Sequence, residues 1–124
     1  MAINSDSKRV AGTLYLAVNG TTLPAKGSFQ VGYGEEKKEA VVGVSGVHGY
    51  KAMAQVAFIE GVITNRADLD VKALLRVENA TITLEFRGGK TLVLRDAWFA
   101  GDGVLNADEG ELQVRFEGLA LEEL

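Results

Sequence analysis

The stretch TITLEFRGGKTLVLRDAWFA, residues 81–100, carries the clearest strand signal in the chain. In its first half Ile82, Leu84 and Phe86 alternate with other side chains, which is the period-two pattern of a strand with one buried face. The two glycines that follow suit a tight turn, because glycine adopts positive φ angles readily. The second half is apolar again. We therefore predict two antiparallel strands joined by a short turn.

The same pattern recurs on both sides of this stretch. TLYLAV (13–18) alternates and is followed by Asn19-Gly20, the strongest short signal for a type I′ hairpin turn. Pro24 cannot donate to a strand ladder, so its segment should lie at a sheet edge or a bulge. Near the end of the chain, GELQVRFEG (110–118) predicts a strand with alternate apolar residues turned inward. Further alternation at 29–33 adds another strand.

QVAFIEGVIT (55–64) is apolar on both faces and predicts a strand covered on both sides. Glu60 is out of place in it. A buried carboxylate without a partner is costly, so we expect Arg66, Arg95 or a backbone N–H to pair with it. The next segment, NRADLDVKALLRVEN, predicts one short helix over residues 68–77, with Asp68 as its N-cap.

These elements predict a mainly β, single-domain fold for residues 1–124: a β-barrel or sandwich of about six to seven antiparallel strands with one short flanking α-helix. Three segments stand apart. Residues 34–53 carry charges and then three glycines spaced by three, and are expected to form a long inter-subunit loop or a hairpin extension. Residues 1–11 are expected to be an N-terminal arm, and residues 119–124 a C-terminal tail.

Composition narrows the function. The 124 residues include no cysteine, which excludes disulfides and thiolate metal sites. The formal net charge is −4, and residues 96–124 hold eight acids and one base, so no concentrated basic face for nucleic acid is indicated. The polar start and the lack of a long apolar run predict neither a secretory signal nor membrane insertion.

The sequence contains no complete catalytic or metal-binding motif among those considered. GVSGVHG (43–49) matches neither a dinucleotide fingerprint nor a P-loop, and misses the nucleophile elbow because its fifth residue is Val47. His48 is the single histidine, with Ser45 close in sequence but nothing to orient the pair. Counting from Asp102, the acidic stretch misses the calcium-loop spacing at its third and sixth positions. We therefore predict no enzyme activity, no cofactor and no metal site.

Several stretches together resemble the tail tube proteins of Mu-like contractile-tailed bacteriophages. They are GVHGYK (46–51), FIEGVIT (58–64), DLDVKALL (68–75), GGKTLVLRDAWFAGDG (88–103) and EGELQVRFEG (109–118). The resemblance spans nearly the whole chain in order. It implies hexameric rings that stack into a hollow tube through which DNA is delivered, with neighbouring strands joined around the lumen.

The resemblance also implies the partners and the location. A sheath surrounds the tube, a tape-measure protein and then DNA occupy it, baseplate and tail-terminator proteins meet its ends, and the subunit passes from the host cytoplasm into the virion tail. Two alternatives remain: a tube of a tailocin or secretion-type injection machine, and a small monomeric β-barrel that binds a ligand.

Residue roles follow as expectations. Aromatic side chains are favoured at subunit interfaces. The interface candidates are Tyr33, Glu35, Lys37, Lys38, Val42, Val47, His48 and Tyr50. The acidic stretch between two predicted strands is expected to form a charged rim that meets a stacked neighbour or faces the DNA path. Its candidates are Asp102, Asp108, Glu109 and Glu111.

Overall fold

The structure, a computed structural model, describes residues 14–124, so the expected arm at residues 1–11 lies outside the described residues. The described chain is mainly β, as predicted. Its elements are β1 (Leu14–Val18), β2 (Thr21–Leu23), β3 (Ala25–Tyr33), β4 (Lys37–Gly43), β5 (Gly46–Met53), β6 (Ala57–Thr64), α1 (Val71–Leu75), β7 (Ala80–Phe86), β8 (Thr91–Phe99), β9 (Leu105–Asn106), β10 (Glu111–Gly118) and β11 (Ala120–Glu123).

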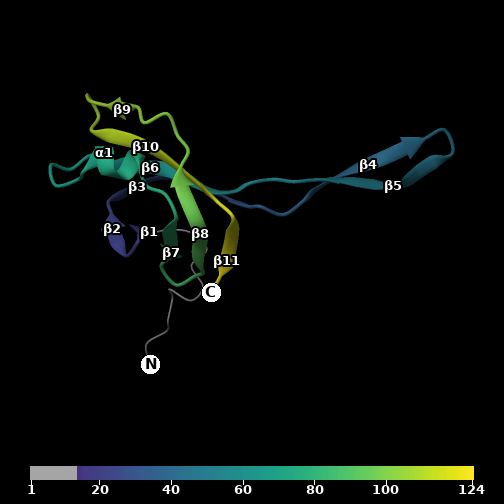
Figure 1. Cartoon of the computed structure of the whole chain (residues 1–124), viewed down its shortest axis with the longest axis horizontal. Helices are drawn as coiled ribbons and strands as arrows, with labels where there is room; N and C mark the ends of the chain where they lie inside the picture. The colour runs from purple at the N-terminus through teal and green to yellow at the C-terminus, as the bar shows by residue number, and fades with distance from the viewer. Residues whose placement is uncertain (1–13) are drawn as a thin grey trace.

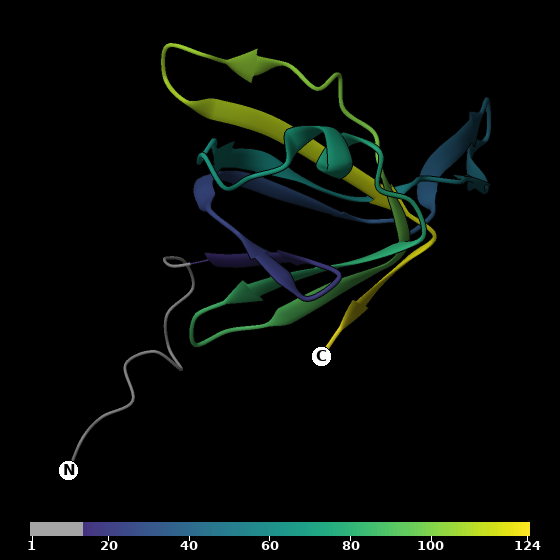
Figure 2. The same cartoon turned by 60° about the vertical axis from the view of Figure 1, so that its left-hand side comes forward.

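Nine of these strands form one antiparallel sheet that folds over on itself. The strand order is β2-β1-β7-β8-β10-β6-β3, with β11 added to β8 and β9 added to β10. Figure 2 shows the two resulting layers, with β3, β6 and β10 above β1, β2, β7 and β8. Among the strands of residues 14–124, β4 and β5 pair only with each other. The count of strands exceeds the predicted six or seven because the segments at 37–53, 105–106 and 120–123 are also strands.

The core lies between the two layers. Fully buried side chains from the lower layer meet those of the upper layer, and the largest are Leu16, Ile82, Leu84, Leu94, Ile59, Ile63, Leu112 and Phe116. The alternation that predicted the strands predicts most of this core, since every second residue of β10 is buried and so is every second residue of β7 up to Leu84, whereas Phe86 is half-buried. The rings of Phe99 and Phe116 pack edge to face at 5.6 Å between centroids.

The turn at Asn19-Gly20 is confirmed. Both residues have positive φ, 49° and 85°, as a type I′ turn requires. The Asn19 side chain also accepts a hydrogen bond from the Thr81 amide at 2.9 Å, which ties this turn to the start of β7. Pro24 lies where the chain leaves the edge strand β2 for β3, so its missing N–H interrupts no ladder.

Two strands turn the sheet at the same corner. β8 pairs with β7 and β11 along most of its length, but its last residues, Trp98 and Phe99, pair with β10. Asp96 makes the bend with φ 50°. Opposite it, β10 ends at Gly118 and the chain continues into β11 after one residue. A Cβ on Gly118 would lie 2.7 Å from the Arg95 carbonyl oxygen, so this close crossing requires glycine.

Three predictions need correction. The helix spans only Val71–Leu75, and its N-cap is Asp70, which accepts from the Ala73 amide at 3.1 Å; Asp68 instead lies 3.3 Å from Arg66. Residues 120–123 are not a loose tail but the strand β11, paired with β8. β6 is fully buried on one face only, because no layer of residues 14–124 covers Phe58, Glu60 and Val62, which are half-buried.

Candidate assembly surfaces

The β4–β5 hairpin extends away from the two-layered body (Figure 1). Its seven cross-strand pairs run from Lys37↔Met53 at the base to Gly43↔Gly46 at the tip. Every residue of β5 is exposed. Residues 34–53 are therefore the hairpin extension that was one of the two sequence-based expectations, not a long loop.

One face of this hairpin is apolar. Directly opposite residues in an antiparallel pair share a face, and the register pairs Ala40 with Tyr50 and Val42 with Val47. We call these four residues and Ala52 the apolar hairpin face; Lys38, which pairs with Ala52, lies on the same side. Val42, Val47 and Tyr50 are 68%, 73% and 61% exposed. The opposite face is mixed: it carries Lys37 and the Glu39–Lys51 pair at 3.6 Å, but also Val41 and Met53.

The hairpin carries most of the predicted interface residues but spreads them over different positions. Val42, Val47 and Tyr50 lie on the apolar hairpin face, and Lys38 lies over the Tyr50 ring at 5.1 Å from its centroid. Lys37 lies on the opposite face, and Glu35 in the link to the body.

His48 occupies a bulge near the hairpin tip, where the register shifts between Val41 and Val42. Its Nε2 lies 3.0 Å from the Ser45 hydroxyl, and its ring covers Gly43. Ser45 and His48, the two residues considered for catalysis, thus contact each other on an exposed turn. The contact stabilises that turn.

The links between hairpin and body contain few contacts. Residues 34–36 and 54–56 lie in no strand. One hydrogen bond joins them, from the Gln55 side chain to the Glu35 carbonyl at 3.1 Å. Gly34 has φ 75° and lies against Ala57, so this position favours glycine.

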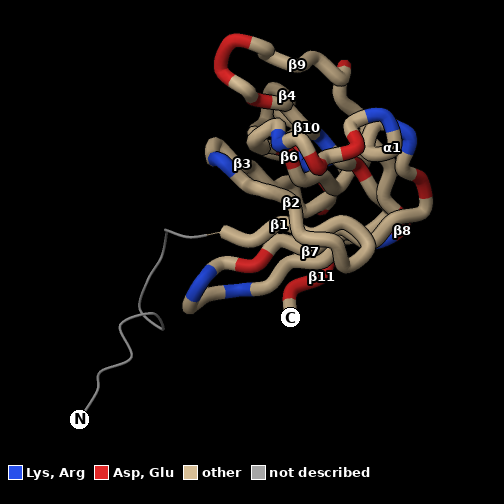
Figure 3. Tube along the Cα trace, turned by 90° about the vertical axis from the view of Figure 1, so that its left-hand side faces the viewer, with Lys and Arg blue, Asp and Glu red and all other residues tan. Residues whose placement is uncertain are grey.

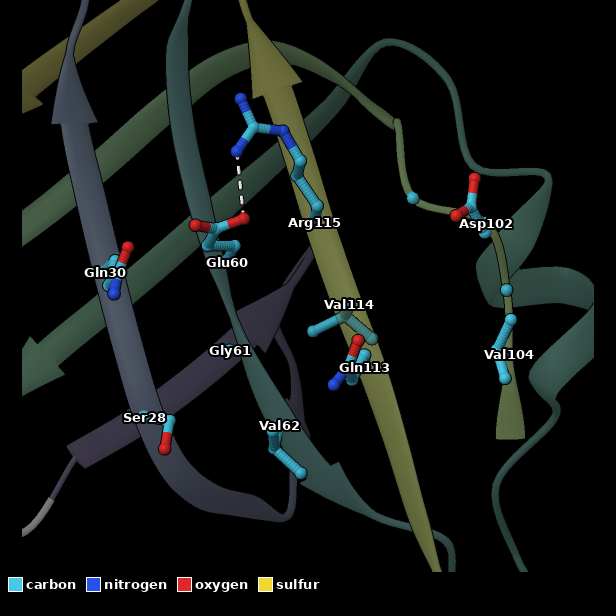
Figure 4. A pocket seen from close by; sticks show the side chains of 12 residues that line it. Ser28, Gln30, Glu60, Gly61, Val62, Asp102, Val104, Gln113, Val114 and Arg115 are labelled. Carbon is cyan, nitrogen blue, oxygen red and sulfur yellow. Dashed lines mark hydrogen bonds and ion pairs between the residues drawn. The ribbon is translucent and has the colours of Figure 1, made fainter. Parts of the chain in front are cut away.

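The uncovered face of β3, β6 and β10 carries polar side chains beside Phe58 and Val62, and the loop 101–104 borders it to form a groove of about 350 Å³ (Figure 4). Arg115 dominates this face. Its guanidinium lies 2.9 Å from Glu60, 3.0 Å from Glu117 and 4.0 Å above the Phe58 ring centroid. Glu60 therefore pairs with Arg115 and not with the expected Arg66 or Arg95. The two carboxylates outweigh burial and raise the pKa of Arg115.

The four acidic candidates do not converge. Asp102 lines the groove, whereas Asp108 and Glu109 lie on the turn before β10, at the end of the body that Figure 3 shows in red beside β9. Glu111 pairs with Lys26 on β3 at 2.5 Å, and this hydrogen-bonded ammonium lowers the Glu111 pKa. Within residues 14–124 no three His, Asp or Glu side chains gather closely enough to hold a metal ion.

The sequence predicted neither of two charged clusters, one around Glu123 and one around Arg115. Tyr33 was expected at an interface, but its hydroxyl donates to Glu123 at 2.6 Å, and Lys90 donates to the same oxygen at 2.9 Å. No local pattern links these positions. The sequence did contain a signal for the pairing of Arg115 with Glu60. Arg115 is the one base among residues 96–124, and it lies on a strand whose side chains alternate between two faces, as do those of the strand that carries Glu60.

The chain was compared with known proteins. Residues 7–123 match the family model described as phage tail tube protein. The chain belongs to this family. A tail tube relative, the Mu-like prophage FluMu tail tube protein of Haemophilus influenzae, is 29% identical over 108 residues, which are 87% of this chain and 90% of the relative. The resemblance drawn from the sequence is thus confirmed.

Solved structures share the tail tube fold at low identity. A sheath–tube complex of the extracellular contractile injection system PVC, in the extended state, matches with a TM-score of 0.63 and 11% identity over 100% of this chain and 98% of that one. The sheath/tube terminator of the same system matches with a TM-score of 0.61 and 11% identity over 90% and 92%. The cap that terminates the tube of the anti-feeding prophage matches at 0.58 and 10% over 100% and 99%.

One finding concerns membranes. Among the described residues of this tail tube protein, no helix has the length and apolar character needed to span a bilayer.

Proposed function

We propose that this tail tube protein is the repeating subunit of the inner tube of a contractile phage tail. Six copies form a ring, rings stack, and DNA passes through the bore to the host. A sheath surrounds the tube, a tape-measure protein occupies it during assembly, and baseplate and terminator proteins meet its ends. The subunit assembles in the host cytoplasm and ends in the virion. Its role is structural, with no catalysis and no cofactor. Membership of the phage tail tube family supports this proposal.

The apolar hairpin face carries the argument for assembly. A two-stranded hairpin is marginally stable alone in water, and β4 and β5 pair with no other strand of residues 14–124. Exposed apolar side chains on such an element mark an interaction site. Because the hairpin extends away from its own body (Figure 1), the surface that covers it belongs to a neighbouring copy.

The edge of β3 supplies a second contact. β3 has nine residues, ends the strand order and pairs only with β6 within the described chain. Its outer N–H and C=O groups are therefore available to a strand of the next subunit. A contact from the β3 edge and the hairpin of one copy to different surfaces of the next is heterologous, and such contacts close into a ring when their rotation permits.

The charged candidates take secondary places in this arrangement. Asp108 and Glu109 on the turn before β10, and separately Asp102 in the groove, are the acids that meet a stacked ring or face the DNA path, where like charge repels phosphate. Glu111 already has Lys26 as its partner and contributes less free charge.

The test compares three forms of the purified protein by negative-stain electron microscopy. The unaltered chain should form stacked rings. The combined variant V42T/V47T/Y50S makes the apolar hairpin face polar and should remain as subunits with an unchanged melting temperature. The control Val41→Thr alters an exposed residue on the opposite face and should assemble. Tubes formed normally by the combined variant would overturn the role of the hairpin.

A tailocin or secretion-type injection tube is the second candidate. The structural similarity to components of an extracellular contractile injection system favours it, although at 11% identity that similarity concerns the fold alone. Electron microscopy of the producing strain's particles separates the two: a DNA-filled head on the tail supports the phage role, and headless particles support the alternative. A monomeric ligand-binding barrel would instead elute as a single subunit from a sizing column at high concentration.

A further inference from the structure

Three segments distant in sequence meet at the root of the hairpin. Tyr33, at the end of β3, donates its hydroxyl to Oε1 of Glu123 at 2.6 Å, and Nζ of Lys90 donates to that oxygen at 2.9 Å. Glu123 belongs to the C-terminal strand β11, and Lys90 immediately precedes β8. β11 lies on the side of the body from which the hairpin extends (Figure 1).

Glu123 is a fixed anchor because β11 is held to β8 independently of Tyr33. Four residues of β11 pair in register with β8, from Ala120↔Arg95 to Glu123↔Leu92. The Leu124 amide donates to the Thr91 carbonyl at 2.8 Å beyond the ladder. Glu122 adds an ion pair with Arg95 at 3.2 Å. The backbone of Tyr33 already pairs with Ala57 of β6. Its side chain adds a second connection, from the root of the hairpin to a strand that other contacts hold in place.

The hairpin needs such a connection. Beyond Tyr33 the two links to the hairpin lie outside any strand and share the hydrogen bond between Gln55 and the Glu35 carbonyl. About ten residues separate the root from the tip, and at ~3.3 Å per residue the hairpin is a lever of roughly 33 Å. A rotation of about 10° at the root would therefore displace the tip by roughly 6 Å, further than the width of one strand spacing.

We propose that Tyr33, Glu123 and Lys90 form a latch that sets the direction of the β4–β5 hairpin, so that the C-terminal strand controls how the hairpin is presented to a neighbour. The latch closes the gap between two sheet edges, β3 and β11. It acts on position and contributes no surface of its own to the neighbour. Its effect on assembly rests on the proposed function, whereas its effect on hairpin direction does not.

The direction is measured in dilute, unassembled subunits. Because the chain contains no cysteine, the pair V44C/T22C places spin labels only at the exposed hairpin tip and on the exposed face of β2. Electron paramagnetic resonance then gives the distribution of tip-to-body distances. Tyr33→Phe, which removes one hydroxyl, and Glu123→Gln, which removes the charge, should each broaden the distribution or shift its centre.

Glu122→Gln is the matched control. It removes a carboxylate from the same strand and breaks the pair with Arg95, but it does not contact the hairpin root. It should leave the distance distribution unchanged, and the melting temperature of each variant shows that the body remains folded. An unchanged distribution for Tyr33→Phe and Glu123→Gln, or equal broadening by Glu122→Gln, would overturn the latch.

Assembly supplies the second readout. If the chain forms tubes, Tyr33→Phe and Glu123→Gln should reduce the yield of tubes on electron micrographs relative to Glu122→Gln. If the unaltered chain forms none, the proposed function fails while the distance measurement still decides on the latch. If the latch variants broaden the distance distribution but form tubes in normal yield, its control of assembly is wrong.

Discussion

Arg115 and Glu60 lie directly opposite each other on β10 and β6, with Nη1 of the arginine 2.9 Å from Oε2 of the glutamate. The same guanidinium holds Glu117 and covers the Phe58 ring. One cation thus serves two carboxylates and an aromatic ring on the sheet face that borders the groove. This arrangement explains how an apolar-looking strand carries a glutamate without leaving its charge unpaired.

Replacing Glu60 and replacing Arg115 should lower the free energy of unfolding by different amounts. Glu60→Gln should lower the free energy of unfolding by about 0.5–1 kcal/mol, because Arg115 keeps Glu117 and both side chains are partly solvated. Arg115→Gln should cost more, about 1–2 kcal/mol, because it also leaves two neighbouring carboxylates without a cation. Urea unfolding of dilute subunits measures both. An unchanged stability in Glu60→Gln would show that this pair contributes nothing.

Gly118→Ala should destabilise the body by about 1–3 kcal/mol, the range for a side chain forced into occupied space. The obstacle is the Arg95 carbonyl oxygen, 2.7 Å from the new Cβ, and a backbone atom cannot rotate away. Gly27→Ala is the control, because nothing lies within 4 Å of its added Cβ. Thermal melting compares them, and equal melting temperatures would mean that the corner accommodates a methyl group.

Asp70→Ala should cost about 1 kcal/mol, the usual loss on removing an N-cap. The side chain of Asp70 accepts from the Ala73 amide at 3.1 Å, and alanine leaves that donor unpaired. Asp68→Ala, which breaks only an exposed pair with Arg66, should change stability by less than about 0.5 kcal/mol. The reverse order of the two values in urea unfolding would restore Asp68 as the cap.

Deleting the hairpin should leave the body folded. In the described part of the chain β4 and β5 pair only with each other, so replacing residues 37–53 by a two-glycine link removes no ladder with the described body. Both this deletion and the deletion of residues 36–48 alone should abolish tubes and leave a folded monomer. The shorter deletion leaves part of β5 without a partner. Circular dichroism and melting report the fold, and electron microscopy reports assembly. Normal tubes from either deletion would contradict the proposed role of the hairpin.

The pH dependence should follow Glu123 and Glu111. Hydrogen bonds from Tyr33 and then Lys90 lower the pKa of Glu123, and Lys26 lowers that of Glu111. A carboxyl group with a lower pKa in the folded state stabilises that state above its unfolded pKa. This contribution is complete above the ordinary value of 4.5 and is lost as the pH falls through the lowered pKa.

The same cluster should weaken again in alkali. The Glu123 contact raises the pKa of Tyr33 and of Lys90. Groups with raised pKa values stabilise the fold fully below their ordinary values, 10.0 and 10.5, and lose this contribution as the pH rises through the raised ones. Melting scans across pH should therefore show that Glu123→Gln has a lower melting temperature than the unaltered chain at pH values between these acid and alkaline limits. A constant difference at every pH would contradict the assignment.

Local patterns predicted much of the fold correctly. Alternation identified β7 and β10 and their inward side chains, and Asn19-Gly20 identified a type I′ turn. The resemblance of several stretches to tail tube proteins identified the family. The helix boundary was wrong because Asp68 and Asp70 both suit a cap, and only the backbone path shows which of them reaches an amide.

The candidate site was less predictable. Glycine spacing showed that residues 34–53 are unusual, but the glycines did not show that the segment pairs with itself and leaves the body. The C-terminal residues were expected to form a tail and not a strand, because a four-residue strand has little signal of its own. β11 is ordered by its ladder with β8, which lies about 28 residues earlier in the chain.

The period of the apolar residues and the turn residues are local properties, and composition is a property of the whole chain. Together they were enough to predict a β-rich chain whose alternating faces enclose one core. The pairing of Arg115 with Glu60 and of Tyr33 with Glu123 joins residues 55 and 90 positions apart. Such pairs depend on strand order, register and the corner at Asp96 and Gly118, because these bring distant side chains within hydrogen-bond distance. The folded arrangement therefore determines which charges are neutralised and in which direction the hairpin extends.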